Sequence, residues 1–291
     1  MRILIVGAGA TGGYFGGRLA EAGKDVSFLV RPRRAATLTE RGLRIKSPTG
    51  ESVVKPHLVT AETLDGVYDL VILAVKSYTL DEALRDVTPA VGPDSAVVPL
   101  LNGMRHLATL TGAFGPDRAY GGVCRIHAML TDDGDVVQFT GMHRIVHGRP
   151  DGEPDDRVTE ALSGAEFVVA GSTDIVHEMW EKWVFLASIG AATTLFGASI
   201  GEINSVPGGS ALTSAIAAEA TAIAVAAGFP PSDGARAFLR AGVVTTERTT
   251  STMNRDMAAG APLEAEAILA DYHAEAERHR EKNTKSHTRK L

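Results

Sequence analysis

A glycine-rich loop near the N-terminus constrains the fold of this 291-residue chain more than any other feature. Residues 2–6 form a short apolar run typical of a buried strand, and the segment Gly7-Ala8-Gly9-Ala10-Thr11-Gly12 follows directly. This is the pattern G-x-G-x-x-G, placed between a strand and a helix expected from about Thr11 to Ala22, which is the context in which it binds a dinucleotide. Bare backbone permits the tight turn and close approach to a pyrophosphate, and the helix amides face the phosphates. We therefore expect a cofactor site at Gly7, Gly9, Ala10, Thr11 and Gly12.

The remainder of the first half alternates between short apolar runs and helical patterns. Buried strands are expected at 26–30, 70–75 and 96–101, with a helix at 80–87 among the segments between them. This alternation predicts a parallel sheet covered by helices. Residues 120–148 instead form short alternating runs around a turn at 132–135, and we expect this hairpin to extend the same sheet. A loop at 149–154 and a helix–strand pair up to Ala170 should follow.

Helical patterns replace strands after Gly171. They cover residues 174–196, 210–227, 233–240 and 263–280. The sequence thus predicts an α/β Rossmann domain at 1–171 and an all-α domain at 172–291. The chain has 31 glycines, and seven of them lie within the first 23 residues. We attribute this concentration to the phosphate loop and to close packing of the helix behind it.

Composition excludes several classes of function. The net charge of −6 argues against nucleic-acid binding, which needs a basic footprint. No run of about 18 apolar residues free of charges and turn formers is found, so we expect no membrane span and a cytoplasmic protein. The single cysteine, Cys124, excludes an internal disulfide and a cysteine zinc site, and we expect no metal. The basic residues of 273–291, which include Arg289 and Lys290, are interpreted as a frayed, solvated end.

The end of the second expected strand indicates which dinucleotide binds. An NAD site usually carries Asp or Glu there to bind the ribose 2′-hydroxyl. This strand instead ends Phe28-Leu29-Val30-Arg31. Because a guanidinium pairs well with a phosphate, we predict NADPH/NADP⁺ with Arg31 as the main contact. A solvated helix start is the alternative for Arg33 and Arg34.

Several short motifs follow one another in a fixed order over about residues 1–272. They are the glycine loop with Arg31, Val75-Lys76-Ser77, Leu101-Asn102-Gly103, Trp180-Glu181-Lys182, Gly201-Glu202-Ile203, and Thr252-Met253 before Glu264. As a set they resemble the ketopantoate reductases (2-dehydropantoate 2-reductases). The resemblance implies a Rossmann domain, a helical domain like the C-terminal domain of 6-phosphogluconate dehydrogenase, and NADPH in the cleft between them. It also implies reduction of a 2-oxo acid to a 2-hydroxy acid, as in pantothenate biosynthesis.

The resemblance also implies roles for individual residues. Lys182 would be the general acid, and Glu264 would fix this lysine and the substrate hydroxyl. Lys76 and Asn102 would line the cofactor and substrate cleft, and Thr252 would hold the substrate carboxylate. The chemistry agrees, because hydride addition to a ketone leaves an oxyanion that needs a proton donor nearby. The alternatives are a surface lysine at 182, a strand-end charge at 76 and a turn residue at 102.

Three positions depart from the family pattern. Leu186, Gly190 and Ile200 stand where the pantoate-pathway enzymes carry Asn, and the sequence after residue 272 also diverges. We expect a wider, more apolar pocket near Gly190, with Ser188, Thr193 or Thr194 supplying the remaining polarity, and a 2-oxo acid other than ketopantoate. The alternatives are an NADP-binding sensor or structural paralogue without turnover, and an oxidoreductase of the wider 6-phosphogluconate dehydrogenase-like group working in the oxidative direction. A homodimer is the default assembly.

Overall fold

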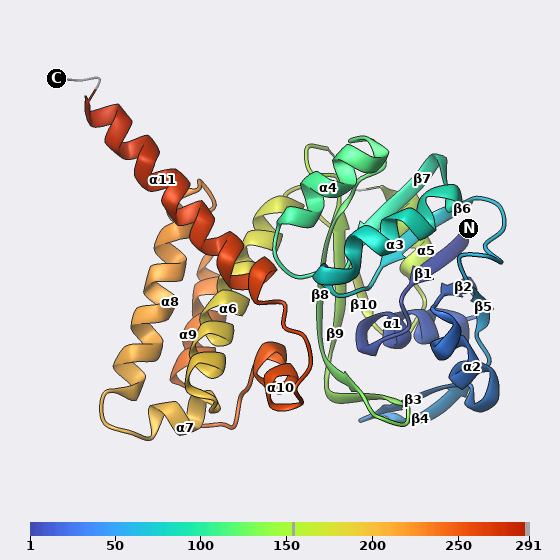
Figure 1. Ribbon diagram of the computed structural model, residues 1–291, viewed down its shortest axis with the longest axis horizontal. Helices are drawn as coiled ribbons and strands as arrows, with labels where there is room; N and C mark the ends of the chain where they lie inside the picture. The colour runs from blue at the N-terminus through green and yellow to red at the C-terminus, as the bar shows by residue number, and fades with distance from the viewer. Residues whose placement is uncertain (153–154, 289–291) are drawn as a thin grey trace. The chain divides into compact units, whose positions relative to one another are not determined.

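The computed structural model describes residues 1–152 and 155–288, which form two compact units (Figure 1). The first unit contains residues 1–101 and 106–176. The second contains the chain from residue 177 onward together with the short segment 102–105. Glu153 and Pro154 of the expected loop lie outside the described residues, as do Arg289 and Lys290.

A five-stranded parallel sheet forms the centre of the first unit. Its strands are β1 (Arg2–Val6), β2 (Asp25–Leu29), β5 (His57–Val59), β6 (Tyr68–Leu73) and β7 (Val91–Pro99). They lie in the order β5-β2-β1-β6-β7, and every neighbouring pair is parallel. The predicted parallel sheet is therefore confirmed. Since the chain leaves β1 first toward β2 and later returns to β6 on its other side, the carboxyl ends of β1 and β6 form the topological switch point where open α/β sheets bind ligands.

Helices cover both faces of this sheet because its strands are apolar on both sides. Ile3 and Ile5 pack with Phe15 of α1 (Ala10–Glu21) and with α5 (Asp156–Leu162). Leu4 and Val6 point the other way, into a second core. That core is completed by α3 (Leu80–Val87) and α4 (Arg105–Phe114). The remaining helical elements of this unit are α2 (Pro32–Arg41) and the 3-10 turns η1 (Ser77–Thr79) and η2 (Thr88–Ala90).

The expected hairpin does not extend the parallel sheet, so that prediction is wrong. β8 (Gly121–Leu130) and β9 (Val136–Gly148) form a second sheet with β3 (Leu43–Ser47), β4 (Gly50–Val54) and β10 (Val168–Gly171). The chain just before β8 makes an isolated bridge to β7, but β9 then pairs in parallel with β3 and β10. The alternating pattern predicts the hairpin and the strand before Ala170, but β3 is distant in sequence and had no recognised signal of its own.

Helix α1 lies between the two sheets and is held there by glycines. A Cβ atom built on Gly16 would lie 2.6 Å from Phe28 of the parallel sheet. One built on Gly17 would lie 2.5 Å from Ile45 of the second sheet. Real Cβ atoms essentially never come so close, so both sheets approach the bare helix backbone. This confirms that the N-terminal glycines serve helix packing as well as the loop.

The second unit is helical. It contains α6 (Ile175–Phe196), α7 (Ile200–Asn204), α8 (Gly209–Ala226), α9 (Asp233–Val244), α10 (Thr252–Ala258), a π-helical turn η3 (Glu266–Ala270) and α11 (Asp271–Thr288). Aromatic rings hold its core: Trp183 lies edge-on to Tyr272 at 4.6 Å and Trp180 stacks on Phe229 at 5.1 Å. Because α11 continues to Thr288, the prediction of a frayed end is wrong for residues 273–288.

Helix α8 is unusually apolar. Among the described residues it alone is long and apolar enough, by length and composition, to cross a membrane, with a mean hydropathy of 1.4. The sequence did not reveal it as an uninterrupted apolar run, because Glu219 lies within it. A single helix of this kind is weak evidence for a membrane span, since helices of soluble proteins meet the same criteria. In the second unit the carbonyl of Ala220 accepts a 2.6 Å hydrogen bond from the Tyr272 hydroxyl of α11, which ties α8 to its neighbour.

Replacing Gly122 by alanine should destabilise the first unit. A Cβ atom at this position of β8 would overlap the carbonyl oxygen of Pro99, at the end of β7. Because backbone must move to relieve the overlap, we expect Gly122→Ala to lower the free energy of unfolding by about 2 kcal/mol in urea denaturation. Gly141→Ala is the matched control in the same hairpin, since a Cβ there meets nothing within 4 Å. Its expected change is within about 0.5 kcal/mol, and equal losses in both variants would contradict this account.

Candidate functional site

The glycine loop has the geometry that a pyrophosphate requires. Gly7 adopts a φ of +95°, and its amide donates to the carbonyl of Leu29 at 3.0 Å, which makes the tight turn after β1. A Cβ atom on Gly12 would overlap the Gly7 carbonyl oxygen, so this position must lack a side chain. At Gly9 a Cβ would meet nothing within 4 Å, and the backbone there borders open space.

The N-terminus of α1 adds hydrogen-bond donors to this loop. The helix begins at Ala10 and Thr11, and its N-cap, Gly9, supplies no side chain to cap the first amides. The first N–H groups of a helix have no acceptor within the helix and carry the positive end of its dipole. A dinucleotide pyrophosphate therefore fits the loop both in shape and in charge.

Lys76 lies at the same edge of the sheet as the glycine loop. It follows β6, whose strand runs parallel to β1 with Leu73 opposite Val6. A Cβ atom on Gly7 would lie 3.0 Å from the carbonyl oxygen of Ala74, two residues before the lysine. Lys76 is half-buried and starts the 3-10 turn η1. The structure thus places Lys76 and the loop on the two sides of the switch point.

Arg31 stands at a third neighbouring strand end. It follows β2 after Val30, forms the N-cap of α2 and has a side chain that is 64% exposed. Its guanidinium Nη2 donates to the Glu82 carboxylate, which comes from the first turn of α3. Since β2, β1 and β6 are adjacent, the structure brings together three sequence-predicted cofactor elements: Arg31, the glycine loop and Lys76.

Arg34 is not part of a solvated helix start, so that alternative is wrong for this residue. Its Nε donates to the carbonyl of Ala8 in the glycine loop, and its Nη1 donates to the carbonyl of Gly134 in the hairpin turn, both at 3.0 Å. Burial lowers the pKa of this guanidinium from its ordinary value. Arg33 is exposed, as that alternative supposed. Arg34 therefore links the loop to the hairpin.

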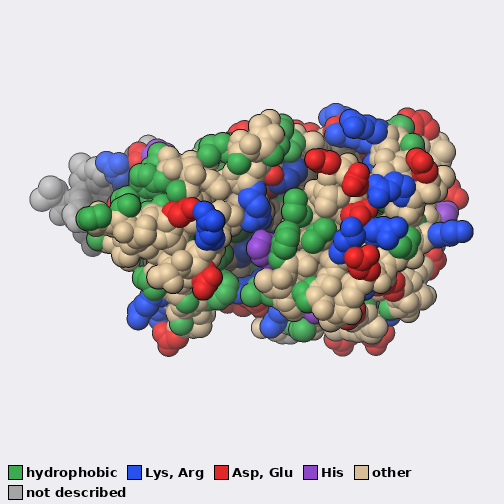
Figure 2. Space-filling model, turned by 90° about the horizontal axis from the view of Figure 1, so that it is seen from below, with side chains coloured by type: hydrophobic (Ala, Val, Ile, Leu, Met, Phe, Trp, Pro, Cys, Tyr) green, Lys and Arg blue, Asp and Glu red, His purple; other side chains and the backbone are tan. Residues whose placement is uncertain are grey.

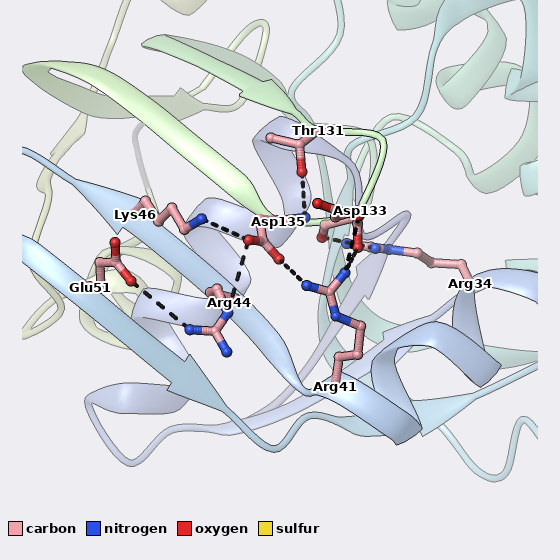
Figure 3. Close-up of polar contacts among 9 residues, drawn as sticks. Arg34, Arg41, Arg44, Lys46, Glu51, Thr131, Asp133 and Asp135 are labelled. Atoms are coloured by element: carbon pink, nitrogen blue, oxygen red, sulfur yellow. Dashed lines mark hydrogen bonds and ion pairs between the residues drawn. The ribbon is translucent and has the colours of Figure 1, made fainter.

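A buried carboxylate, Asp135, holds the neighbouring elements in place (Figure 3). Its oxygens lie 3.0 Å from Lys46 Nζ, 3.4 Å from Arg41 Nη2 and 3.9 Å from Arg44 Nε. These cations come from β3 and from the last turn of α2. The sequence predicts only a turn at residues 132–135, and the role of Asp135 was missed. Since Arg34 and Arg41 anchor the two ends of α2, they also fix where its N-cap Arg31 stands.

Two further site candidates meet in the second unit. Asn102 Nδ2 donates to Glu264 Oε2 at 3.3 Å, although the residues are 162 positions apart. Glu264 is buried, with 4% of its surface exposed. Asn102 follows β7 closely in sequence but lies in the segment 102–105 that belongs to the helical unit. The contact therefore depends on how this short segment, which we call the strap, is held.

The strap is fastened by charge and by a glycine. Arg105 pairs with Glu266 at 2.9 Å and with the nearly buried carboxylate of Asp271. Gly103 has a φ of +80°, and a Cβ there would lie only 2.5 Å from the carbonyl oxygen of Ala267. These contacts fall on the π-helical turn η3 and the start of α11, and π-helical turns are frequent at functional sites.

Lys182 lies half-buried on α6, which is tied to the same turn. The indole Nε1 of Trp183 donates to the carbonyl of Ile268 at 3.1 Å. The amide of Ile268 in turn donates to the Glu264 carbonyl at 3.0 Å. Glu181, the residue before Lys182, has a structural role, because its carboxylate accepts a hydrogen bond from the amide of Ser232 at 2.8 Å. Helix α6 and the segment that carries Glu264 are thus connected through the neighbour of Lys182.

Most of the hydroxyl groups that we expected to supply polarity to the pocket form hydrogen bonds within the second unit. Ser188 is buried and donates to the carbonyl of Val184 at 2.8 Å. Thr193 is buried too and contacts the Ser251 hydroxyl at 2.8 Å. Thr252 is exposed at the first position of α10. Thr194 Oγ1 is buried and has no hydrogen-bond partner among the described residues.

The space beside Gly190 is filled, so the expectation of a wider pocket there is wrong. A Cβ atom on Gly190 would lie 2.6 Å from the terminal methyl of Met253, a side chain with only 1% of its surface exposed. Ile200 is fully buried. The apolar character that we expected is present, but it comes from Met253, which the sequence offered no means of placing against α6.

Metal binding, the cysteine and the surface charges add little to the description of the site. Among the residues that the structure describes, no group of three or more His, Cys, Asp or Glu side chains could hold a metal ion. Cys124 is a buried free cysteine. Basic and acidic side chains are interspersed over the face seen in Figure 2.

Comparison with known proteins agrees with this geometry. Residues 3–152 match the family described as Ketopantoate reductase PanE/ApbA, and residues 174–285 match its C-terminal counterpart. The chain is 41% identical over 207 residues to the uncharacterized oxidoreductase YkpB of Bacillus subtilis, covering 70% of this chain and 68% of that one. It is 30% identical to the 2-dehydropantoate 2-reductase of Mesorhizobium japonicum, covering 93% and 90%. The 2-dehydropantoate 2-reductase structure from Geobacter metallireducens superposes with a TM-score of 0.86 at 27% identity, covering 96% and 94%. The chain therefore belongs to the ketopantoate reductase family and is an oxidoreductase of that family.

Proposed function

We propose that this protein reduces a 2-oxo acid to the 2-hydroxy acid with NADPH and that Lys182 is the general acid. The observation that carries the proposal is the hydrogen bond between Asn102 and Glu264. It joins residues of two family motifs that are 162 positions apart in the sequence. We also propose domains at 1–171 and 172–291, a cytoplasmic location and a homodimer.

The first unit supports the choice of cofactor. The glycine loop and the amides at the start of α1 would hold the pyrophosphate, and Arg31 would pair with the 2′-phosphate. When bound, NADPH supplies the hydride that adds to the carbonyl carbon. Lys76, at the neighbouring strand end, would hold the nicotinamide side of the site and the substrate.

The second unit supplies the proton and the orientation. Lys182 donates a proton from Nζ to the carbonyl oxygen as negative charge develops there. Glu264 orients the lysine and the forming hydroxyl, and Asn102 fixes the carboxylate of Glu264. Thr252, exposed at the start of α10, is available to hold the substrate carboxylate, and Ser188 would line the site.

The apolar surroundings of α6 point to the substrate class. On the helix face of Lys182, the next two turns carry Leu186 and Gly190, and the methyl of Met253 covers the glycine. A hydroxyl on the substrate side chain would find hydrocarbon there and lose its hydrogen bonds with water. We therefore propose a 2-oxo acid with an apolar side chain rather than ketopantoate. The same substitutions favour a second candidate, an NADP-binding paralogue without turnover.

Removal of the proposed acid should stop catalysis without affecting the cofactor. We expect Lys182→Ala to lower kcat by about 10²- to 10⁴-fold, because general acid catalysis contributes that much. The Kd for NADPH, measured by fluorescence titration, should stay within about twofold. Lys55→Ala removes an exposed lysine as the control and should leave both constants unchanged. Undiminished turnover by Lys182→Ala would reject Lys182 as the acid.

A panel of 2-oxo acids tests the substrate class. With NADPH in steady state, we expect kcat/KM for 2-oxoisovalerate or 2-oxo-4-methylpentanoate to exceed that for ketopantoate by at least about tenfold. Ketopantoate as the best substrate would contradict the assignment. Tight NADP⁺ binding with no NADPH oxidation by any acid of the panel would instead support the paralogue without turnover.

Loss of Arg105, which anchors the strap, should slow catalysis. Arg105→Ala leaves the nearly buried carboxylate of Asp271 unpaired, so we expect a loss of about 1–2 kcal/mol in stability. Because Asn102 then holds Glu264 less firmly, kcat should fall about tenfold with little change in the Kd for NADPH. Arg105→Lys should recover part of the loss. Arg236→Ala, which breaks an exposed pair with Asp233 in the same unit, is the control; an equal fall in its kcat would count against the strap.

A further inference from the structure

The ion pair between Arg31 and Glu82 spans the edge of the parallel sheet. Arg31 follows β2, while Glu82 lies in the first turn of α3, the helix that comes after β6 and η1. β1 and its glycine loop lie between β2 and β6 in the sheet. Both charged side chains are open to solvent, 64% exposed for Arg31 and 49% for Glu82. The pair is therefore accessible to a ligand at the loop.

Arg31 and Arg34, near the start of α2, differ in whether their guanidinium groups can bind such a ligand. Arg34 is committed to the carbonyls of Ala8 and Gly134. Arg31 instead makes its contact with an acid side chain that can move away, since both partners are exposed. Carboxylate and phosphate oxygens accept from a guanidinium in the same way. Glu82 thus engages Nη2 of the guanidinium that would pair with the 2′-phosphate of NADPH.

We propose that Glu82 is a specificity-determining residue that competes with the 2′-phosphate for Arg31 and so reduces the preference for NADPH over NADH. This inference rests on the proposed function, in which Arg31 takes the 2′-phosphate. A dianionic phosphate beside Arg31 competes with Glu82 for the guanidinium and also meets the negative charge of Glu82. A nucleotide without the 2′-phosphate meets neither obstacle. The selectivity of the site is then set by a carboxylate on α3 and not by the second strand alone.

The test uses two adenine nucleotides that cannot react, 2′,5′-ADP and 5′-AMP, titrated calorimetrically into the full chain. Glu82→Gln keeps the shape of the side chain and removes its charge. We expect it to tighten 2′,5′-ADP binding by about three- to tenfold and to leave 5′-AMP within about twofold. Asp81→Asn is the matched control, because it removes the same charge from the neighbouring position of the same turn.

Unchanged or weaker 2′,5′-ADP binding by Glu82→Gln would overturn the proposal, and so would an equal gain in Asp81→Asn, which would indicate a general effect of net charge. In an Arg31→Ala background the gain from Glu82→Gln should disappear. Arg31→Ala alone should weaken 2′,5′-ADP more than 5′-AMP. If it weakens neither, the cofactor assignment of the proposed function fails, and this result differs from one in which Arg31 matters and Glu82 does not.

Discussion

The bare face of α1 is the constraint on which the first unit depends. Gly16 and Gly17 let Phe28 and Ile45 approach the helix backbone from two different sheets, and Gly13 admits Val136 of the hairpin. Any side chain at these positions would push one sheet away, because packed interiors accommodate even a methyl group poorly. The phosphate loop is the N-terminal continuation of this helix. Its position is therefore fixed by helix packing on both sides and by the hydrogen bonds of Gly7 and Ala8.

In the second unit a short strap has the corresponding role. Residues 102–105 leave the end of β7 and are held on η3 and α11 by Arg105 and by the close approach of Gly103 to Ala267. Trp183 fastens α6 to the same turn through the Ile268 carbonyl. Three segments that are remote in sequence thus converge near Glu264, each by a contact that does not itself involve the proposed chemistry.

Local patterns predicted those features whose cause is local. The glycine loop, the alternation of buried strands and helices, and the order of the family motifs each follow from neighbouring residues, and the fold class is confirmed. Features that depend on contacts between residues distant in sequence could not be predicted in this way. One partner strand of the hairpin is β3, some 90 residues earlier, with Ile45 opposite Val136. Likewise, nothing in Arg31-Pro32-Arg33-Arg34 says which guanidinium will turn inward, because that is decided by the carbonyls of Ala8 and Gly134.

In the proposed function, the residues assigned to the chemistry differ from those that would meet the substrate side chain. The chemistry is assigned to Lys182, Asn102 and Glu264, and the last two are in contact. The substrate side chain would meet Leu186 and Gly190, where the resemblance leads us to expect amides, and Met253 packs over the glycine. Hydrogen-bonding groups discriminate strongly because a missing partner leaves a buried polar atom unsatisfied, whereas an apolar wall distinguishes a methylene by only about 1–3 kcal/mol. In the proposed reaction, exchanging amides for hydrocarbon therefore broadens the range of acids accepted as well as shifting it.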